Sequence, residues 1–135
     1  MPKLNYKNIP TDFFDMLPLP IIVLKYDKDT LNHSIIYLNS SFDSVISWSR
    51  EEIPDKAHWW GKAYPEPKYQ KVVESLWELK MESMLSANNV DNFAIVIVNV
   101  TTKYNGVKRF KVYSEFKSVL IDGYYVVAFK EIENN

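Results

Sequence analysis

The two histidines, His33 and His58, are the side chains of this sequence that titrate nearest to neutral pH. A metal or catalytic role needs partner residues at suitable spacing, and neither histidine has them. We expect His33 in a turn between two strands, and His58 lies beside Trp59. Packed or solvated histidines are therefore favoured over ligands, and the sequence predicts no metal site.

Three glutamates, Glu74, Glu78 and Glu82, recur every fourth residue and would share one face of a helix. A general acid needs a shielded, apolar setting, which nothing around them indicates, and Lys71 lies nearby. The chain has no cysteine, which excludes thiolate catalysis and disulfides, and its three glycines form no phosphate-binding loop. We expect no catalytic residue, so the sequence predicts that the chain is not an enzyme.

Aromatic residues make up 15% of the chain, which suggests a wide core or a lined cavity. Large rings with polar edges suit a small organic ligand, so the tryptophans are the best candidates to face one. Plain core packing is the simpler alternative for each apolar residue. The candidates to line a cavity are Leu38, Phe42, Ile46, Trp59, Trp60, Val73, Trp77, Ile95, Val112 and Phe129.

Length and charge narrow the class of protein. A chain of 135 residues predicts one domain with a real core. Its net charge of -1 provides no basic field for nucleic acid. The apolar runs at 21–24 and 93–98 are far too short to span a bilayer, and the N-terminus has no apolar signal core. We expect a cytoplasmic protein that binds neither nucleic acid nor membrane.

Helical and extended periodicities alternate along the first two thirds of the chain. Asn39, Ser40 or Ser41 is expected to cap a helix that carries Phe42 and Ile46. Ser49 and Glu52 have the spacing of a capping box that opens another helix. The expected elements are a short helix from Thr11 or Asp12 to Leu17, strands at 21–26 and 34–38, these two small helices, an irregular stretch at 57–67, and one long amphipathic helix at 68–87.

The last third is predicted to be three strands. Residues 93–102 are nearly continuously apolar, as in a central strand covered on both faces. Residues 107–120 alternate, and 124–132 form the last strand, with tight turns at Asn105-Gly106 and Asp122-Gly123. Because an isolated hairpin is marginal in water, the first two strands must join these three. The result is an α+β fold with a five-stranded antiparallel sheet and helices packed on one face.

This layout resembles the PAS domain over nearly the whole chain. The motifs that carry the resemblance are Leu17-Pro-Leu-Pro-Ile21, Ile36-Tyr-Leu-Asn39 with Phe42, Ser49-Arg-Glu-Glu-Ile53, Tyr64-Pro-Glu-Pro67 and Glu131-Ile132. The tryptophans at 59, 60 and 77 are similar to those of sensory-box domains in bacterial signal-transduction proteins. Two departures are Ser47, where a glycine is common, and Glu131, where members often carry Asp.

The resemblance implies a PAS-like sensory or interaction module at residues 12–135, after an N-terminal extension at 1–11. Such a module binds a small ligand or a partner and relays a signal to an output domain that is not in this chain, such as a histidine kinase or diguanylate cyclase. The ligand or cofactor is unknown. Haem is disfavoured because neither histidine lies on the long helix, where haem-binding members place theirs. Covalent flavin is excluded by the lack of cysteine, whereas non-covalent flavin stays open.

Apolar residues outside the expected core indicate a homodimer. They either pair with a second copy or pack within the chain, because an apolar patch of that size must be covered. The dimer candidates are Ile9, Phe13, Phe14, Leu17, Tyr124 and Val126.

Two other functions stay open at this point. A small cone-shaped α+β enzyme or carrier of the steroid-isomerase-like type would need an acid or base in its cavity, where we expect only tyrosines and Ser114. A ligand-free dimerisation module is the third alternative.

Overall fold

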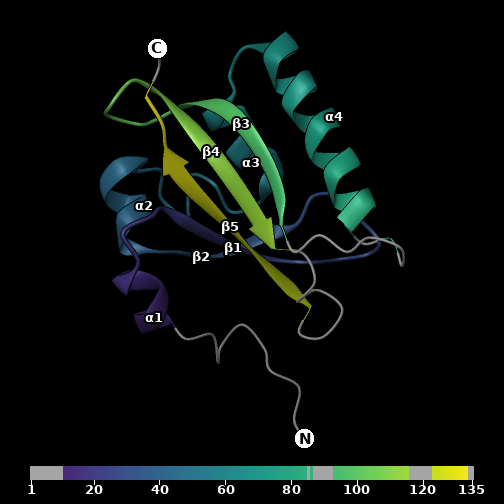
Figure 1. Cartoon of the computed structure of the whole chain (residues 1–135), viewed down its shortest axis with the longest axis horizontal. Coiled ribbons are helices and arrows are strands. Elements are labelled where there is room, and N and C mark those ends of the chain that lie inside the picture. Colours follow the sequence, from purple (N-terminus) through teal and green to yellow (C-terminus); the bar gives the residue numbers. More distant parts are fainter. Residues whose placement is uncertain (1–10, 85, 87–92, 116–122, 134–135) are drawn as a thin grey trace, which may run out of the picture.

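The computed structural model describes residues 11–84, 86, 93–115 and 123–133. One antiparallel sheet of five strands, in the order β2-β1-β5-β4-β3, forms the centre of the molecule (Figure 1). The elements are α1 (Thr11–Met16), β1 (Ile21–Lys25), β2 (Ser34–Leu38), α2 (Ser40–Val45), α3 (Lys56–Ala63), α4 (Pro67–Met84), β3 (Ala94–Thr101), β4 (Val107–Glu115) and β5 (Tyr124–Glu131). Side chains of α2, α3 and α4 form one core with one face of this sheet, which confirms the predicted fold class.

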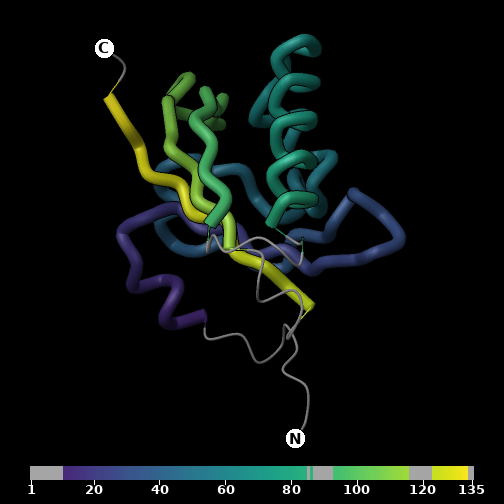
Figure 2. The backbone as a smooth tube through the Cα atoms, turned by 45° about the vertical axis from the view of Figure 1, so that its right-hand side comes forward, coloured from purple at the N-terminus to yellow at the C-terminus, as the bar shows by residue number. Residues whose placement is uncertain are grey.

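The long helix α4 stands alongside the β3–β4 hairpin (Figure 2). It buries Val73, Trp77, Met81 and Met84, which recur at the four-residue and three-residue spacing of one helical face. The sequence predicts a broader apolar stripe, which includes Val72, Leu76 and Leu79, on the helix expected at 68–87. That prediction is wrong in its width, because Val72, Leu76 and Leu79 are exposed on α4.

Strand β3 lies at the edge of the sheet and is covered on one face. Its residues alternate, so that Val96 and Val98 are buried while Ile95 and Ile97 are 41% and 48% exposed. The prediction of a central strand covered on both faces is therefore wrong. A continuous apolar run is typical of a doubly covered strand, but here the described residues cover the outward side chains only in part.

Helix α3 replaces the irregular stretch that the sequence predicts at 57–67. Asp55 caps it, because its carboxylate accepts from the His58 backbone N–H at 2.9 Å. The capping box before it does form, since the Ser49 N–H donates to Glu52 Oε1 at 3.0 Å and the Glu52 N–H donates to Ser49 Oγ at 3.3 Å. It closes a single turn rather than the predicted helix, because Pro54 follows and cannot continue it.

Asn39 ties α1, β1 and α2 together and caps α2, as the sequence predicts. The side chain is fully buried, and its Oδ1 accepts from the N–H groups of Ile21 at 2.8 Å and Phe42 at 3.0 Å. Its Nδ2 donates to the carbonyls of Phe14 at 2.8 Å and Leu19 at 2.9 Å. Both lone pairs of its oxygen and both N–H groups of its amide are used, in three separate segments of the chain.

Replacing Asn39 by Ala is expected to lower the free energy of unfolding by about 2–4 kcal/mol, because it leaves several buried backbone groups without a partner. Asn39→Asp keeps the acceptor but loses both donations, so it should also destabilise the fold. Urea unfolding followed by circular dichroism measures both values. The control Ser40→Ala, one position later, should change stability by less than about 0.5 kcal/mol. An Asn39→Ala effect as small as that of the control would contradict the role assigned to this side chain.

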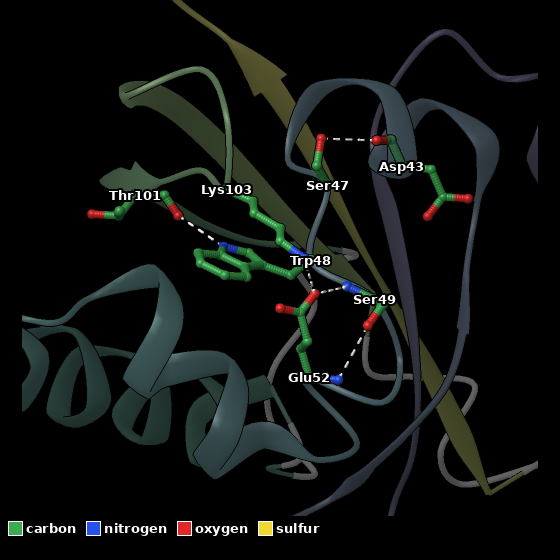
Figure 3. Close-up of polar contacts among 7 residues, drawn as sticks. All are labelled: Asp43, Ser47, Trp48, Ser49, Glu52, Thr101 and Lys103. Atoms are coloured by element: carbon green, nitrogen blue, oxygen red, sulfur yellow. Dashed lines mark hydrogen bonds and ion pairs between the residues drawn. The ribbon is translucent and has the colours of Figure 1, made fainter.

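The chain leaves α2 through a left-handed residue, Ser47, whose φ is 75°. Its Oγ donates to the Asp43 carbonyl at 2.9 Å (Figure 3). The next residue, Trp48, donates through Nε1 to the carbonyl of Thr101 at 3.0 Å, and Lys103 pairs with Glu52 at 2.8 Å. The turn after α2 is thus joined to the end of β3, and the left-handed backbone explains why a glycine would suit position 47.

Two variants at this position isolate the backbone strain, because both lack the hydroxyl. Ser47→Gly is expected to be more stable than Ser47→Ala by about 1 kcal/mol, since only alanine keeps a Cβ in the left-handed region. Thermal or urea unfolding of the pair measures the difference. Equal stabilities would show that Ser47 carries no strain.

Candidate functional site

A small cavity lies between the sheet and helices α3 and α4. Its volume is about 20 Å³, which is room for about one water molecule. Its walls are mostly apolar and aromatic, and one charged residue, Lys56, takes part. The lining residues are Ile22, Leu24, Lys56, Trp59, Tyr64, Val73, Trp77, Val96, Val112, Tyr125, Val127 and Phe129.

The ten residues proposed from the sequence to line a cavity fall into three groups. Trp59, Val73, Trp77, Val112 and Phe129 line the cavity. Leu38, Phe42, Ile46 and Trp60 are buried in the same core without lining it. Ile95 points to the opposite face of the sheet and is 41% exposed, because side chains alternate along β3 and its neighbours Ala94 and Val96 point inward.

Aromatic rings fill most of the space between the layers. The ring of Phe129 lies 5.6 Å from Trp59, 5.7 Å from Phe110 and 6.4 Å from Phe42, each in an edge-on arrangement. Such pairs add to the stabilisation from area burial and hold the rings in fixed orientations. The high aromatic content therefore serves packing first, and the cavity is the space that the rings leave.

Lys56 is the functional candidate that the sequence does not predict. It is 2% exposed, and its Nζ lies 5.0 Å from the centre of the Trp60 ring, within the range of a cation–π contact. Burial lowers its pKa to about 8, although the negative charges of Glu78 and Glu74 act in the opposite direction. A lysine in a polar stretch that contains prolines is expected to lie in solvent, and Lys56 is buried only because α3 docks against the core.

His33 is a buried histidine that forms a polar cluster with Tyr125 and Lys56. Its Nε2 lies 3.2 Å from the carbonyl oxygen of Asp27, and its Nδ1 lies 2.7 Å from the Tyr125 hydroxyl. A carbonyl can only accept, so we assign the proton to Nε2 and the role of acceptor from Tyr125 to Nδ1. Burial lowers the pKa of His33 to about 4, the positive charge of Lys56 adds to this, and the ring is neutral at pH 7.

Two buried polar atoms have no hydrogen-bond partner within the described part of the chain: the indole Nε1 of Trp60 and the hydroxyl of Ser114. Ser114 is fully buried on β4, as the strand alternation predicts. An orphaned buried donor costs free energy, so both atoms mark places where the core is not fully satisfied. The unpaired indole lies on the same helix and face as Lys56.

The outer face of the sheet carries the residues proposed for a dimer. Phe14, Leu17, Tyr124 and Val126 are partly buried and pack around Ile21 and Val23. Phe13 is 55% exposed. Ile9 lies outside the described residues. Packing within the chain thus covers part of the patch, while the outward residues of β3 leave another part open.

The described residues contain no cluster of three or more histidines and carboxylates arranged for a metal ion. Among the same residues, no helix combines the length and the apolar character that crossing a bilayer requires.

Comparison with solved structures identifies this architecture. A LOV protein of Rhodobacter sphaeroides superposes with a TM-score of 0.61 at 8% identity, over 93% of this chain and 66% of that one. A PAS domain from Colwellia psychrerythraea gives a TM-score of 0.62 at 11% identity, covering 90% of this chain and 92% of the other. A domain of a sensory box sensor histidine kinase/response regulator from Geobacter sulfurreducens gives 0.58 at 14%, with 92% of both chains covered.

These likenesses show that the chain has the PAS fold. No protein-family model and no curated protein sequence matches it. The chain spans 66% of the length of the Rhodobacter sphaeroides LOV chain.

The neutral, buried state of His33 predicts acid sensitivity. The pKa of His33 is about 6.5 in the unfolded chain and about 4 in the folded protein, so the unfolded state binds more protons between pH 4 and pH 6.5. The free energy of unfolding should therefore fall by about 3 kcal/mol as pH drops from 6.5 to 4. Urea titrations at pH 7, 6 and 5 measure the slope.

His33→Gln should flatten this slope between pH 7 and 5, whatever its effect on stability at pH 7. His58→Gln, at a side chain 60% exposed, is the matched control and should keep it. An unchanged slope in His33→Gln would contradict the assignment.

Proposed function

We propose that this chain is a PAS-type sensory or interaction module that catalyses no reaction and relays the binding of a small ligand or a partner to an output domain. The observation that carries the proposal is a cavity at the junction of β5, α3 and α4, inside a fold shared with domains of sensory proteins. A signal at that junction reaches an element close to the described end of the chain, because β5 ends at Glu131.

The size of the cavity limits the ligand. Pockets for drug-sized ligands have volumes of roughly 300–1,000 Å³, whereas this cavity measures about 20 Å³. A flavin or a haem would need the aromatic core to open widely. The proposal is therefore for a ligand of about the size of one water molecule, or for a partner that binds outside the core.

The relay would be a population shift between two conformations. A ligand moves such an equilibrium only by its difference in affinity for the two states. Val73 and Trp77 contact the cavity from α4, and Tyr125 and Phe129 contact it from β5. A ligand that separates these walls would favour a state in which α4 and β5 are displaced. A histidine kinase or a diguanylate cyclase is the proposed class of output domain, and the Geobacter neighbour is a domain of a sensor kinase.

A ligand-free dimerisation module is the second candidate, and the nearly filled core favours it. Phe93, Ile95 and Ile97 are exposed at β3 on the outer face of the sheet. The proposed dimer residues Tyr124 and Val126 lie on the same face at β5, with β4 between them and β3, and Phe13 of α1 is exposed as well. Aromatic contact between Phe93 and Tyr113, whose rings lie 6.5 Å apart, extends this surface onto β4. A second copy that packs here would cover the patch.

The enzyme alternative would need an acid or base in the cavity. The titratable residues that line it are Lys56, Tyr64 and Tyr125, and burial raises the pKa of both tyrosines. The carboxylates of Glu74 and Glu78 do not line the cavity. The steroid-isomerase-like reading therefore lacks a carboxylate base at the site, and we do not favour it.

Native mass spectrometry of the purified chain tests the proposal. We expect a dimer, or a monomer that carries a small molecule, and a ligand-free monomer at every concentration would contradict it. Ile97→Glu on the outer face of β3 should shift a dimer toward monomer by at least tenfold in dissociation constant, because it places a charge in an apolar interface. Val72→Glu, also at an exposed aliphatic position, is the matched control on α4 and should leave the equilibrium unchanged.

A further inference from the structure

Strand β3 lies at an edge of the sheet, and the first half of that edge is open within the described part of the chain. In an antiparallel pair, alternate residues direct their backbone N–H and C=O groups toward the neighbouring strand or away from it. The Asn99 N–H points away from β4, because it donates to the Tyr69 hydroxyl at 2.8 Å. By the same alternation, Ile95 and Ile97 present their backbone groups at the edge, where no other described residue bonds to them.

The opposite edge of the sheet is protected by the chain itself. The Ile35 N–H of β2 donates to the Pro54 carbonyl at 2.9 Å, and Ser34 forms a bridge with Asp55. Proteins also protect an edge with prolines, charges or bulges, because a bare edge pairs with other strands. Strand β3 contains no proline and no charged residue, and its register with β4 has no bulge. The first half of β3 is therefore suited to pair with an added strand.

An apolar side of α4 lies beside this edge. Four residues follow one another at three-residue and four-residue spacing and share that side of the helix: Tyr69, Val72, Leu76 and Leu79. The bond from Asn99 to Tyr69 places this side next to β3, and both views show α4 and β3 side by side (Figures 1 and 2). The three aliphatic residues are exposed. Together with the edge they form the β3–α4 surface, which consists of Ile95, Ile97, Val72, Leu76 and Leu79.

The charges around the β3–α4 surface are positive. Lys80 is exposed on α4 directly after Leu79, and Lys111 of β4 is paired in register with Ile97. The carboxylates of Glu74 and Glu78 lie toward α3, where their charges act on its buried lysine. A segment that binds here is therefore favoured when it carries acidic residues.

We propose that the β3–α4 surface binds an extended, acidic segment of a partner protein, which adds to the sheet as a strand beside β3. Two residues of the segment exchange N–H···O bonds with Ile95 and Ile97, about four bonds in all. Their side chains point to the outer face of the sheet, beside those of the two isoleucines. The residue between them points to the side of α4, where it packs on Val72 and Leu76.

This geometry defines the partner's chemistry. The segment is about five residues long and rich in β-branched side chains, with carboxylates at its ends. A second copy of this chain fits less well, because β3 has no carboxylate and two copies would bring their Lys80 and Lys111 side chains together. The inference rests on the proposed function in one respect, since it names the partner of an interaction module.

Fluorescence anisotropy with the full chain and the labelled peptide Glu-Val-Thr-Val-Thr-Val-Glu tests the proposal. We expect saturable binding that is at least tenfold tighter than binding of the same peptide N-methylated at both threonines. Methylation removes the N–H groups that β3 accepts and leaves every side chain in place. Lysines in place of the two glutamates should also weaken binding at least tenfold. Absence of binding, or equal binding of the methylated peptide, would overturn the proposal.

Two variants locate the peptide on the protein. Val72→Glu should weaken binding at least tenfold, because it places a negative charge on the apolar side of α4. Lys71→Glu adds still more negative charge to another side of the same helix, so it is the matched control and should change binding less than threefold. Equal effects of the two variants would contradict the site.

Ile97→Pro removes one N–H from the open edge without removing a bond to β4, and it should abolish binding. Circular dichroism checks that this variant folds. If it does not fold, Val72→Glu and the methylated peptide still decide.

The dimer equilibrium separates this inference from the proposed function. A chain that dimerises or carries a small molecule, but does not bind the peptide, keeps the proposed function and removes this inference. A dimer that Val72→Glu breaks would show that a second copy occupies the β3–α4 surface, and it would also overturn the inference.

Discussion

The bonds of the Asn39 amide hold the first half of the molecule in register. This one buried side chain caps α2, accepts from the first residue of β1 and donates to two carbonyls in and after α1. Because the same group serves three segments, the angle at which α2 leaves β2 is linked to the position of α1 on the far side of β1. Phe42 follows within the first turn of α2, and its ring contacts both Trp59 and Phe129. The position of the aromatic core therefore depends on a single polar residue beside it.

This arrangement leaves a well-packed core that also contains a cluster of buried titratable residues. The rings of α2, α3, β4 and β5 meet in edge-on and tilted contacts and fill most of the space between the layers. The cluster consists of Lys56, His33 and Tyr125, in which a neutral histidine accepts from a tyrosine and a lysine faces an indole ring. Burial disfavours the charged form of both Lys56 and His33. A polar cluster of this kind costs stability, and sensory function is our explanation for its presence.

Most of the architecture is predictable from residue patterns. Strand β2 spans Ser34–Leu38, the bounds that the sequence predicts, and the Asn105-Gly106 turn joins β3 to β4 as the dipeptide indicates. The capping role of Asn39 and the inward position of Ser114 follow from local spacing. Two of the errors concern α3 and β3, and each has its own cause. Helix α3 is not predictable from periodicity, because its apolar residues, Trp59, Trp60 and Ala63, do not repeat over enough turns to show a helical period. Strand β3 is predicted to be central because its sequence is a continuous apolar run, but it lies at an edge of the sheet.

The sequence by itself determined the number and type of most elements and the antiparallel order of the last three strands, because these depend on local periodicity and turn chemistry. Only the tertiary structure decided which apolar residues face each other. Ile95 and Trp60 are both cavity candidates in the sequence, yet Ile95 lies on the outer face and Trp60 is buried beside Lys56. The burial of Lys56 and the near closure of the core were also settled there. Both result from how α3 and α4 dock on the sheet, and docking depends on contacts between residues far apart in the chain, which local patterns do not encode.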